Sequence, residues 1–209
     1  MLICIYGLSF KSSERNTIEV DTLKRYGGKM IFFTADNHFC HKNVIRYENR
    51  PFNSTDEMDD YMIKVWNETV NPHDDVYILG DFIFDKKGMV ASDIIQKLNG
   101  KLHMIKGNHD FFLDKTQDLD VLFEWVKDYH ELKYNHIKFI LFHYPIASWH
   151  FQKYGSIHVH GHIHKAKINL SYGRAFNAGV DVNDFRPVSI EYVIQSFEEQ
   201  ILEEQREGE

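Results

Sequence analysis

The sequence predicts an α/β fold in which two mixed β-sheets pack face to face and are flanked by helices. In the first half of the chain, short apolar runs typical of strands alternate with segments of helical periodicity, whereas the second half is dominated by strand-like runs. No internal repeat, low-complexity tract or long linker interrupts this pattern. With 209 residues, 43% of them hydrophobic, the chain can bury one sizeable core, so we expect a single main domain.

Strands are expected where short runs are rich in β-branched and aromatic residues. In the first half these runs are Ile31–Phe33, Val76–Leu79 and Met104–Ile105. In the second half they are Lys138–Phe142, Ser156–His160, Ala175–Val180 and Val188–Ile190. Gly161 is expected to end its strand. We therefore interpret His158 and His160 as strand residues, and only His162 and His164, beyond the glycine, as candidate ligands.

Helices are expected where apolar residues recur at helical spacing. The clearest case places Met58, Met62 and Trp66 on one face, after Ser54 as a helix cap with Glu57 in the first turn. Further helices are predicted at Val90–Leu98, ending at Asn99-Gly100, at Leu119–Val126, and at Glu191–Glu204 as an acidic closing helix.

The domain organisation follows from where these patterns begin and end. We expect residues 30–195 to form the main domain, residues 1–29 to be an N-terminal extension bounded by Gly27-Gly28, and residues 196–209 to be an acidic C-terminal helix or tail. Two alternatives stay open for the extension: it adds an edge strand over Leu2–Leu8, or Met30 is the natural start of the protein.

Charge and composition exclude several classes of protein. There are 24 Lys and Arg against 31 Asp and Glu, a net charge of −7, which is the wrong sign for the phosphate-neutralising surface of a non-specific duplex-DNA binder. No apolar run approaches the roughly 20 residues of a membrane span, and Met1–Phe10 lacks the basic start and cleavage pattern of a signal peptide. Cys4 and Cys40 give no disulfide framework. We therefore predict a cytoplasmic protein with no membrane or duplex nucleic-acid partner.

Five short clusters of histidine, aspartate and asparagine follow the predicted strands. They are Asp36-Asn37-His38, Gly80-Asp81, Gly107-Asn108-His109-Asp110, His143 and Gly161-His162-Ile163-His164. In an open α/β sheet the loops after the strands converge on one ligand site. Two divalent ions about 3.5–4 Å apart can hold the attacking and leaving oxygens of an in-line displacement, and imidazole with carboxylate ligands suits Mn, Fe and Zn. A single histidine such as His38 is more often a surface or core residue, but the set as a whole predicts a two-metal phosphoesterase centre.

The order and residue types of these clusters resemble the calcineurin-like metallophosphoesterase superfamily, whose motif series is DxH, GD, GNH(D/E), H and GHxH. The resemblance extends from Met30 to about Val193 and so covers most of the chain. More narrowly, His41-Lys42-Asn43, Asn49-Arg50-Pro51-Phe52, His143-Tyr144-Pro145 and Asn177–Val182 are similar to a small bacterial and phage branch of predicted phosphohydrolases. The resemblance implies the four-layer α/β/β/α sandwich of the superfamily.

The resemblance also implies a role for each cluster. The first of two divalent metal ions, expected to be Mn with Fe or Zn as alternatives, would be held by Asp36, His38, Asp81 and His164. The second would be held by Asp81, Asn108, His143 and His162, so that Asp81 bridges the pair. His109 would donate a proton to the leaving oxygen, with Asp110 to orient it, and a hydroxide between the metals would be the nucleophile. Phe84 departs from the family pattern, because many relatives carry an acid or amide there.

The substrate is expected to be a small or nucleotide-type phosphodiester. Arg46 and Arg50 follow the first motif and are candidate phosphate contacts, although ordinary surface arginines look the same. Three alternatives remain: a phosphomonoesterase such as a protein phosphatase, a nuclease, or a non-catalytic scaffold on the same fold. The negative charge and the lack of an obvious aromatic and basic track disfavour the nuclease. The intact Asn108 and His109 argue against the scaffold. The oligomeric state is left open.

Overall fold

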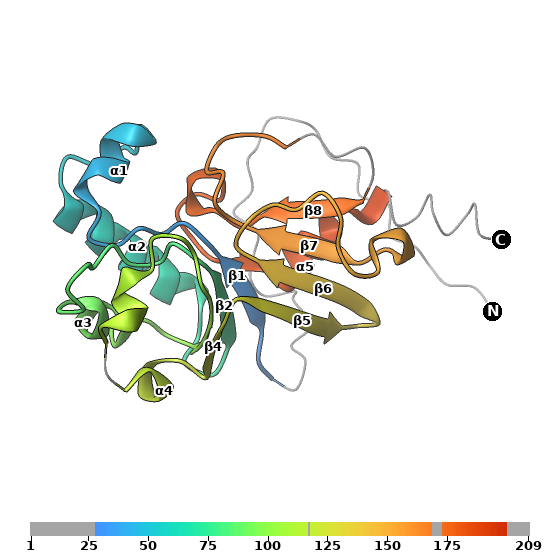
Figure 1. Cartoon of the computed structure of the whole chain (residues 1–209), viewed down its shortest axis with the longest axis horizontal. Coiled ribbons are helices and arrows are strands. Elements are labelled where there is room, and N and C mark those ends of the chain that lie inside the picture. The colour runs from blue at the N-terminus through green and yellow to red at the C-terminus, as the bar shows by residue number, and fades with distance from the viewer. Residues whose placement is uncertain (1–27, 117, 169–172, 200–209) are drawn as a thin grey trace.

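The computed structural model describes residues 28–116, 118–168 and 173–199. The edge strand expected over Leu2–Leu8 and the end of the helix expected over Glu191–Glu204 lie outside the described residues. Seventeen helices and strands follow one another along the described chain. The strands form two sheets that face each other (Figure 1).

The first sheet has five strands in the order β4-β3-β2-β1-β9. Their bounds are Ile31–Thr34 (β1), Asp75–Leu79 (β2), Lys101–Ile105 (β3), Trp125–Lys127 (β4) and Val188–Ser189 (β9). Strands β1 to β4 are parallel, and β9 runs antiparallel to β1.

The second sheet has four strands in the order β5-β6-β7-β8. Their bounds are Tyr129–Tyr134 (β5), Ile137–Phe142 (β6), Ile157–His160 (β7) and Arg174–Asn177 (β8). The β5–β6 pair is antiparallel, whereas β6, β7 and β8 are parallel, so both sheets are mixed as predicted.

Strand alternation divides the core into two parts. Phe33 points into the core between the sheets, where its ring stacks on that of Phe139 at 5.9 Å and joins the two sheets. The neighbouring Phe32 points to the opposite face, into a second core that includes Met58 and Trp66 of a helix.

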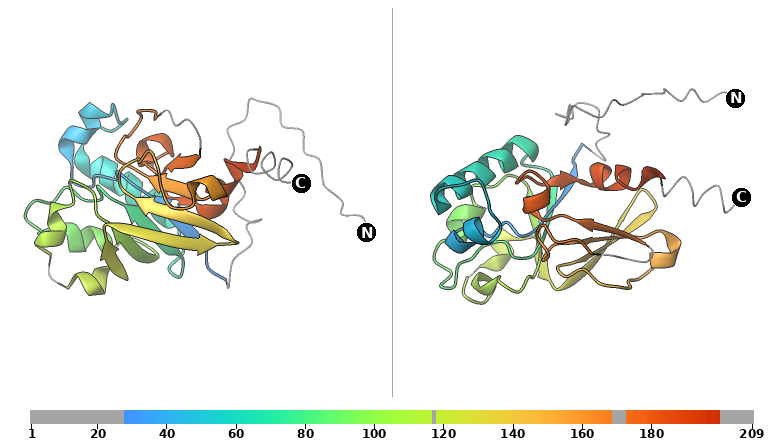
Figure 2. Two further views of the ribbon diagram at one scale, coloured as in Figure 1. Left: turned by 45° about the vertical axis from the view of Figure 1, so that its right-hand side comes forward. Right: turned by 90° about the horizontal axis from the view of Figure 1, so that it is seen from above.

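The helices flank the sheets (Figure 2). Four of them contribute to the core on the outer face of the five-stranded sheet: Lys42–Tyr47 (α1), Thr55–Thr69 (α2), Ala91–Ile95 (α3) and Leu119–Leu122 (α4). A fifth helix, Ile190–Gln195 (α5), packs Ile190 and Val193 into the core between the sheets. The prediction of two mixed sheets flanked by helices is confirmed. The segment 143–156 crosses the outer face of the four-stranded sheet (Figure 1). In this segment the ring of Trp149 lies 5.3 Å from that of His158.

Two predicted elements differ from the observed ones in type or extent, and one observed strand was not predicted. The helix expected over Leu119–Val126 stops at Leu122, because Glu124 donates its N–H to the carbonyl of Leu102 and begins the pairing of β4 with β3. The strand expected over Ala175–Val180 ends at Asn177, and Val180–Val182 forms a 3-10 turn (η4) instead. Strand β5 was not predicted, because its sequence YHELKY has no continuous apolar run.

Candidate metal centre

Six of the seven predicted ligands meet in two triads. The first triad is Asp36, His38 and His164, and the second is Asp81, His143 and His162. Within each triad, one ligand atom from each residue lies within 4.8 Å of the others. The seventh predicted ligand, Asn108, places its side-chain oxygen 3.1 Å from Nε2 of His143, beside the second triad. Loops after β1, β2, β3, β6 and β7 therefore bring together residues from both sheets.

The carboxylate of Asp81 belongs to the second triad and also approaches the first. Its Oδ2 is 3.7 Å from Nε2 of His38, and its Oδ1 is 3.6 Å from Nε2 of His143. The same Oδ1 accepts a hydrogen bond of 2.8 Å from the backbone N–H of His109. Each oxygen of this one carboxylate therefore faces a different histidine cluster.

The backbone at the centre is strained. Five of the seven predicted ligands have positive φ: Asp36 (54°), His38 (51°), Asp81 (54°), His162 (72°) and His164 (46°). This left-handed conformation costs a residue with a side chain about 1–2 kcal/mol, and it persists only where the surroundings impose it. Here the N–H of Asp36 bonds to the carbonyl of Gly80, and the N–H of His38 to that of Asp81. Such strain clusters at functional sites.

Two glycines let neighbouring loops approach the aspartates. A Cβ at Gly107 would clash with the backbone N and Oδ1 of Asp81, and a Cβ at Gly161 would lie 2.9 Å from Oδ2 of Asp36. The glycines of the GNHD and GHIH sequences are therefore required for close packing of these loops.

Hydrogen bonds from the outside orient two of the histidines. Nδ1 of His143 lies 2.7 Å from the carbonyl of Leu79, and Nδ1 of His164 lies 2.7 Å from Oδ2 of Asp181. Partners of this kind fix the ring and its tautomer, and they leave Nε2 free for a ligand. Nδ1 of His38 is buried and has no hydrogen-bond partner among the described residues. These imidazole and carboxylate donors fit divalent Mn, Fe or Zn.

Burial controls the charge of the first triad. It raises the pKa of Asp36 to about 7, despite the nearby His164 and two bonds from the N–H of His162 at 2.9 and 2.8 Å. Burial, together with the charges of His164 and Arg50, lowers the pKa of His38 to about 2. A histidine with so low a pKa stays neutral and keeps a lone pair available for a cation.

Asp181 is a site residue that sequence reasoning missed. Its carboxylate accepts bonds from Nε and Nη2 of Arg50, at 2.9 and 2.8 Å, in addition to its contact with His164. Burial raises the pKa of Asp181, but the bonds from His164 and Arg50 outweigh burial and lower it to about 2. The available signal was the Asn177–Val182 segment, which follows β8 and was noted without a role.

Arg50 does not fit the predicted substrate contact. Besides Asp181, its guanidinium donates to the carbonyls of Asn37 and Asp36, at 2.8 and 2.7 Å, and its side chain is fully enclosed. Arg50 therefore holds in place the loop after β1, which carries Asp36 and His38. Arg46 lies exposed on α1 with its guanidinium 5.2 Å from the centre of the Tyr47 ring, and its substrate contact stays a prediction.

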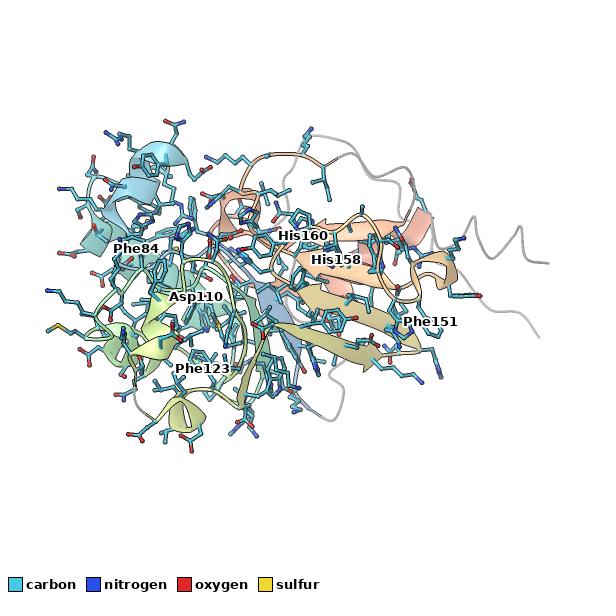
Figure 3. The ribbon with its side chains drawn as sticks, in the orientation of Figure 1. Phe84, Asp110, Phe123, Phe151, His158 and His160 are labelled. Atoms are coloured by element: carbon cyan, nitrogen blue, oxygen red, sulfur yellow. The ribbon has the colours of Figure 1, made fainter. Side chains whose placement is uncertain are left out.

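Asp110 does not orient His109 as predicted. Its buried carboxylate instead accepts the backbone N–H groups of Asp81, Phe82 and Gly107, at 2.8, 2.7 and 2.7 Å. Figure 3 labels Asp110 within the five-stranded half of the molecule. Burial raises the pKa of Asp110 to about 7, although these N–H groups oppose the shift. Asp110 therefore links the loop of Gly80-Asp81 to the loop of Gly107–Asp110 through hydrogen bonds.

His109 belongs to neither triad, and its ring lies 5.6 Å from that of His38.

The departure at Phe84 has a structural consequence. The ring of Phe84 stacks on His41 at 3.9 Å and lies 6.1 Å from the ring of His109. The adjacent Asp85 turns away from the centre, because its carboxylate accepts the N–H groups of Lys87 and Val90. An aromatic side chain thus stands where the motif resemblance implies a polar one.

No helix in the described part of the chain is both long and apolar enough to cross a bilayer.

No family model matches the sequence. A protein of unknown function from Aquifex aeolicus, AQ665, shares the fold, with a TM-score of 0.63, 22% identity, and coverage of 80% of this chain and 98% of that one. The fold and the five motifs of the present chain fit the calcineurin-like metallophosphoesterase superfamily.

Two sequence relatives cover most of the chain. The Gene 66 protein of Mycobacterium phage L5 is 28% identical over 179 residues, which are 72% of this chain and 86% of the phage protein. The uncharacterized protein MJ1445 of Methanocaldococcus jannaschii is 34% identical over 176 residues, which are 81% of this chain and 92% of that protein. With that identity over nearly the full length of the relative, the chain belongs to the same family as MJ1445.

Proposed function

We propose that this protein is a phosphoester hydrolase that depends on two divalent metal ions and prefers small or nucleotide-type phosphodiesters. The observation that carries the proposal is the meeting of two aspartate–histidine triads at Asp81, with one carboxylate oxygen toward each. An arrangement of this kind suits a carboxylate shared by two ions. The motif resemblance to metallophosphoesterases supports the same conclusion independently.

Seven side chains would hold the ions, which we propose to be manganese, with iron or zinc as alternatives. Those at the first site are Asp36, His38, Asp81 and His164, and those at the second are Asp81, Asn108, His143 and His162. When bound, the ions supply Lewis acidity and lower the pKa of water. The carboxylates offset the positive charge, while Asp181 and the carbonyl of Leu79 keep two imidazoles in the required orientation.

His109 is the residue we propose as the proton donor to the leaving oxygen. It is in neither triad, and its ring lies beside His38 at the centre. Its backbone N–H is bonded to Asp81, which fixes its position relative to the proposed shared carboxylate. A histidine in this position can supply a proton to a departing alkoxide, which is a poor leaving group without one.

The preference for diesters follows from the cations around the centre. Arg50 is enclosed by protein acceptors, so its guanidinium offers nothing to a substrate. A dianionic monoester gains most from additional cations, whereas a diester carries one negative charge and needs fewer. We therefore expect diesters to be hydrolysed faster than monoesters.

The test uses protein stripped by a chelator and reloaded with manganese. We expect metal-dependent hydrolysis of bis-p-nitrophenyl phosphate that exceeds hydrolysis of p-nitrophenyl phosphate, and close to two ions per chain. Asp81→Asn should lower metal content and reduce activity by orders of magnitude. Asp120→Asn, at an exposed position of α4, is the matched control and should change neither. Undiminished hydrolysis in excess chelator would reject the metal-dependent mechanism, and much faster monoester hydrolysis would reject the diester preference.

A further inference from the structure

Two exposed aromatic rings border the candidate metal centre at different points. Tyr144 is 37% exposed, and its ring lies 4.8 Å from that of His143 and 4.5 Å from that of His162. Phe111 is 44% exposed, and its ring meets that of His109 edge-on at 6.2 Å. Neither ring belongs to the hydrophobic cores of the described residues. Both are therefore available to a ligand at the centre.

A pocket adjoins one of the two rings. It has a volume of about 240 Å³, and Phe111, Lys106 and Asn108 are among the residues that line it. Asn108 is one of the proposed metal ligands, so the pocket opens beside the centre. Lys106 is exposed and provides a cation. The pocket thus lies beside the candidate metal centre and combines the aromatic ring of Phe111 with the cation of Lys106 and the exposed carboxylate of Asp114.

The backbone of Tyr144 contacts a buried histidine. Nε2 of the fully buried His158 lies 3.2 Å from the carbonyl of Tyr144, and Nδ1 lies 3.0 Å from the carbonyl of Ile140 in β6. A neutral imidazole carries one N–H, so His158 donates to one of these two carbonyls, while its buried ring packs against the backbone of Tyr144. Figure 3 shows His158 on β7. A ring with an anchored backbone and an exposed surface is suited to stacking.

We propose that Tyr144 and Phe111 are base-stacking subsites, and that the substrate is a nucleoside phosphodiester with unpaired bases. This inference rests on the proposed function and names its substrate class. Every nucleobase has a π-face, so exposed aromatic rings bind bases with little dependence on sequence. Phe111 contacts the proposed proton donor and therefore faces the leaving arm of the diester, whereas Tyr144 contacts two proposed metal ligands and faces the retained arm.

The surroundings favour unpaired over paired bases. Paired and stacked bases of a duplex present no free face to a ring, and the net charge of −7 opposes broad contact with a duplex. Phe84 is not a stacking site, because His41 lies against its ring and Nζ of Lys86 lies 5.2 Å from its centre.

The test compares two esters that share a p-nitrophenyl leaving group. One is methyl p-nitrophenyl phosphate, and the other is the p-nitrophenyl ester of thymidine monophosphate. For the manganese-loaded wild type we expect kcat/KM to be roughly 5- to 150-fold higher for the thymidine ester, which is the range that one base stack provides. Tyr144→Ala should abolish this ratio and leave the methyl ester rate unchanged, whereas Tyr144→Phe should retain it.

Phe111 is tested with dithymidine monophosphate, in which the leaving group is itself a nucleoside. Phe111→Ala should lower kcat/KM for this substrate by a similar factor, with metal content and thermal stability unchanged. Tyr154→Ala is the matched control, since Tyr154 is 82% exposed and has a ring contact only with Phe151 among the described residues. It should alter neither measurement.

Failure of the stacking inference and failure of the proposed function give different results in these assays. Equal rates on the methyl and thymidine esters would overturn the stacking inference and leave the proposed phosphodiesterase in place. An equal loss on both esters in Tyr144→Ala would also overturn it, since the ring would then only support the metal ligands. A metal-loaded wild type that hydrolyses none of the three substrates would reject the proposed function itself.

Discussion

His109 is held in the centre by its backbone and by ring contacts, not by a side-chain hydrogen bond that the structure describes. Its N–H donates to Asp81, and its ring contacts those of His38, Phe84 and Phe111. Because the residue is in neither triad, removing its imidazole should leave the proposed ligands in place. Catalysis and metal binding can therefore be separated at this residue.

His109→Ala should leave metal content close to that of the wild type and slow hydrolysis of alkyl diesters by about 100- to 10,000-fold. The loss should be smaller for p-nitrophenyl esters, because p-nitrophenolate departs without a proton. Metal analysis and steady-state kinetics on both substrate types measure the two effects. His73→Ala, at an exposed position before β2, is the matched control. Loss of metal, or full activity on alkyl diesters, would contradict the proposed role.

The residues that sequence predicted and those it missed differ in how they act. The triad residues occur in short blocks whose ligand chemistry can be recognised locally. Asp181 acts through Arg50, which is 131 residues away in the sequence, and through His164. Asp110 acts on backbone N–H groups of another loop. Such roles depend on tertiary contacts, so no local pattern in a single sequence could assign them.

At the level of elements, a buried carboxylate joins α2 to the loop after β1. Asp59 of α2 accepts the N–H of Cys40, with distances of 3.2 and 3.0 Å to its two oxygens. Burial raises the pKa of Asp59 to about 6, although the bonds from Cys40 oppose the shift. The folded state therefore binds this proton more tightly than the unfolded state, whose pKa is close to the ordinary value of 3.8.

Because the pKa of Asp59 is higher in the folded state, the free energy of unfolding depends on pH. The contribution of Asp59 to stability is fully present below pH 3.8 and is lost as the pH rises through about 6. Asp59→Asn keeps an acceptor for the N–H of Cys40 without the buried charge. We expect the variant to gain about 1–2 kcal/mol of unfolding free energy over the wild type between pH 4 and pH 7. Urea unfolding at both pH values measures this gain, and Glu68→Gln, at an exposed position of the same helix, is the control. A constant difference between wild type and Asp59→Asn would contradict the assigned pKa.

Sequence predicted those helices and strands whose signals, such as an apolar face or a capping residue, lie within or next to the element itself. The best predicted helix was α2, because its apolar face and its Ser54 cap, which accepts the N–H of Glu57, are both local signals. The error at β4 has a different origin. Its residues fit a helical pattern, but pairing with β3 places Trp125 opposite His103 and decides the outcome. Tertiary pairing thus overrode local periodicity.

For the whole molecule, the important feature is that both sheets supply the proposed ligands. Asp36, His38, Asp81 and Asn108 follow strands of the five-stranded sheet, whereas His143, His162 and His164 follow strands of the four-stranded sheet. Each triad contains residues from both sheets. Bound ions would therefore cross-link the two halves of the sandwich, which the apolar contact of Phe33 with Phe139 already joins.

Metal binding should consequently stabilise the entire fold. A ligand that binds only the folded state adds about 2.7 kcal/mol at a concentration 100 times its Kd. Differential scanning calorimetry should show a Tm several degrees higher with manganese than in chelator. His143→Ala removes a ligand from the four-stranded sheet and should reduce this increase, whereas His136→Ala, in the exposed turn between β5 and β6, should retain it. If manganese raised the Tm of wild type and His143→Ala equally, the ions would bind elsewhere and would not join the two sheets.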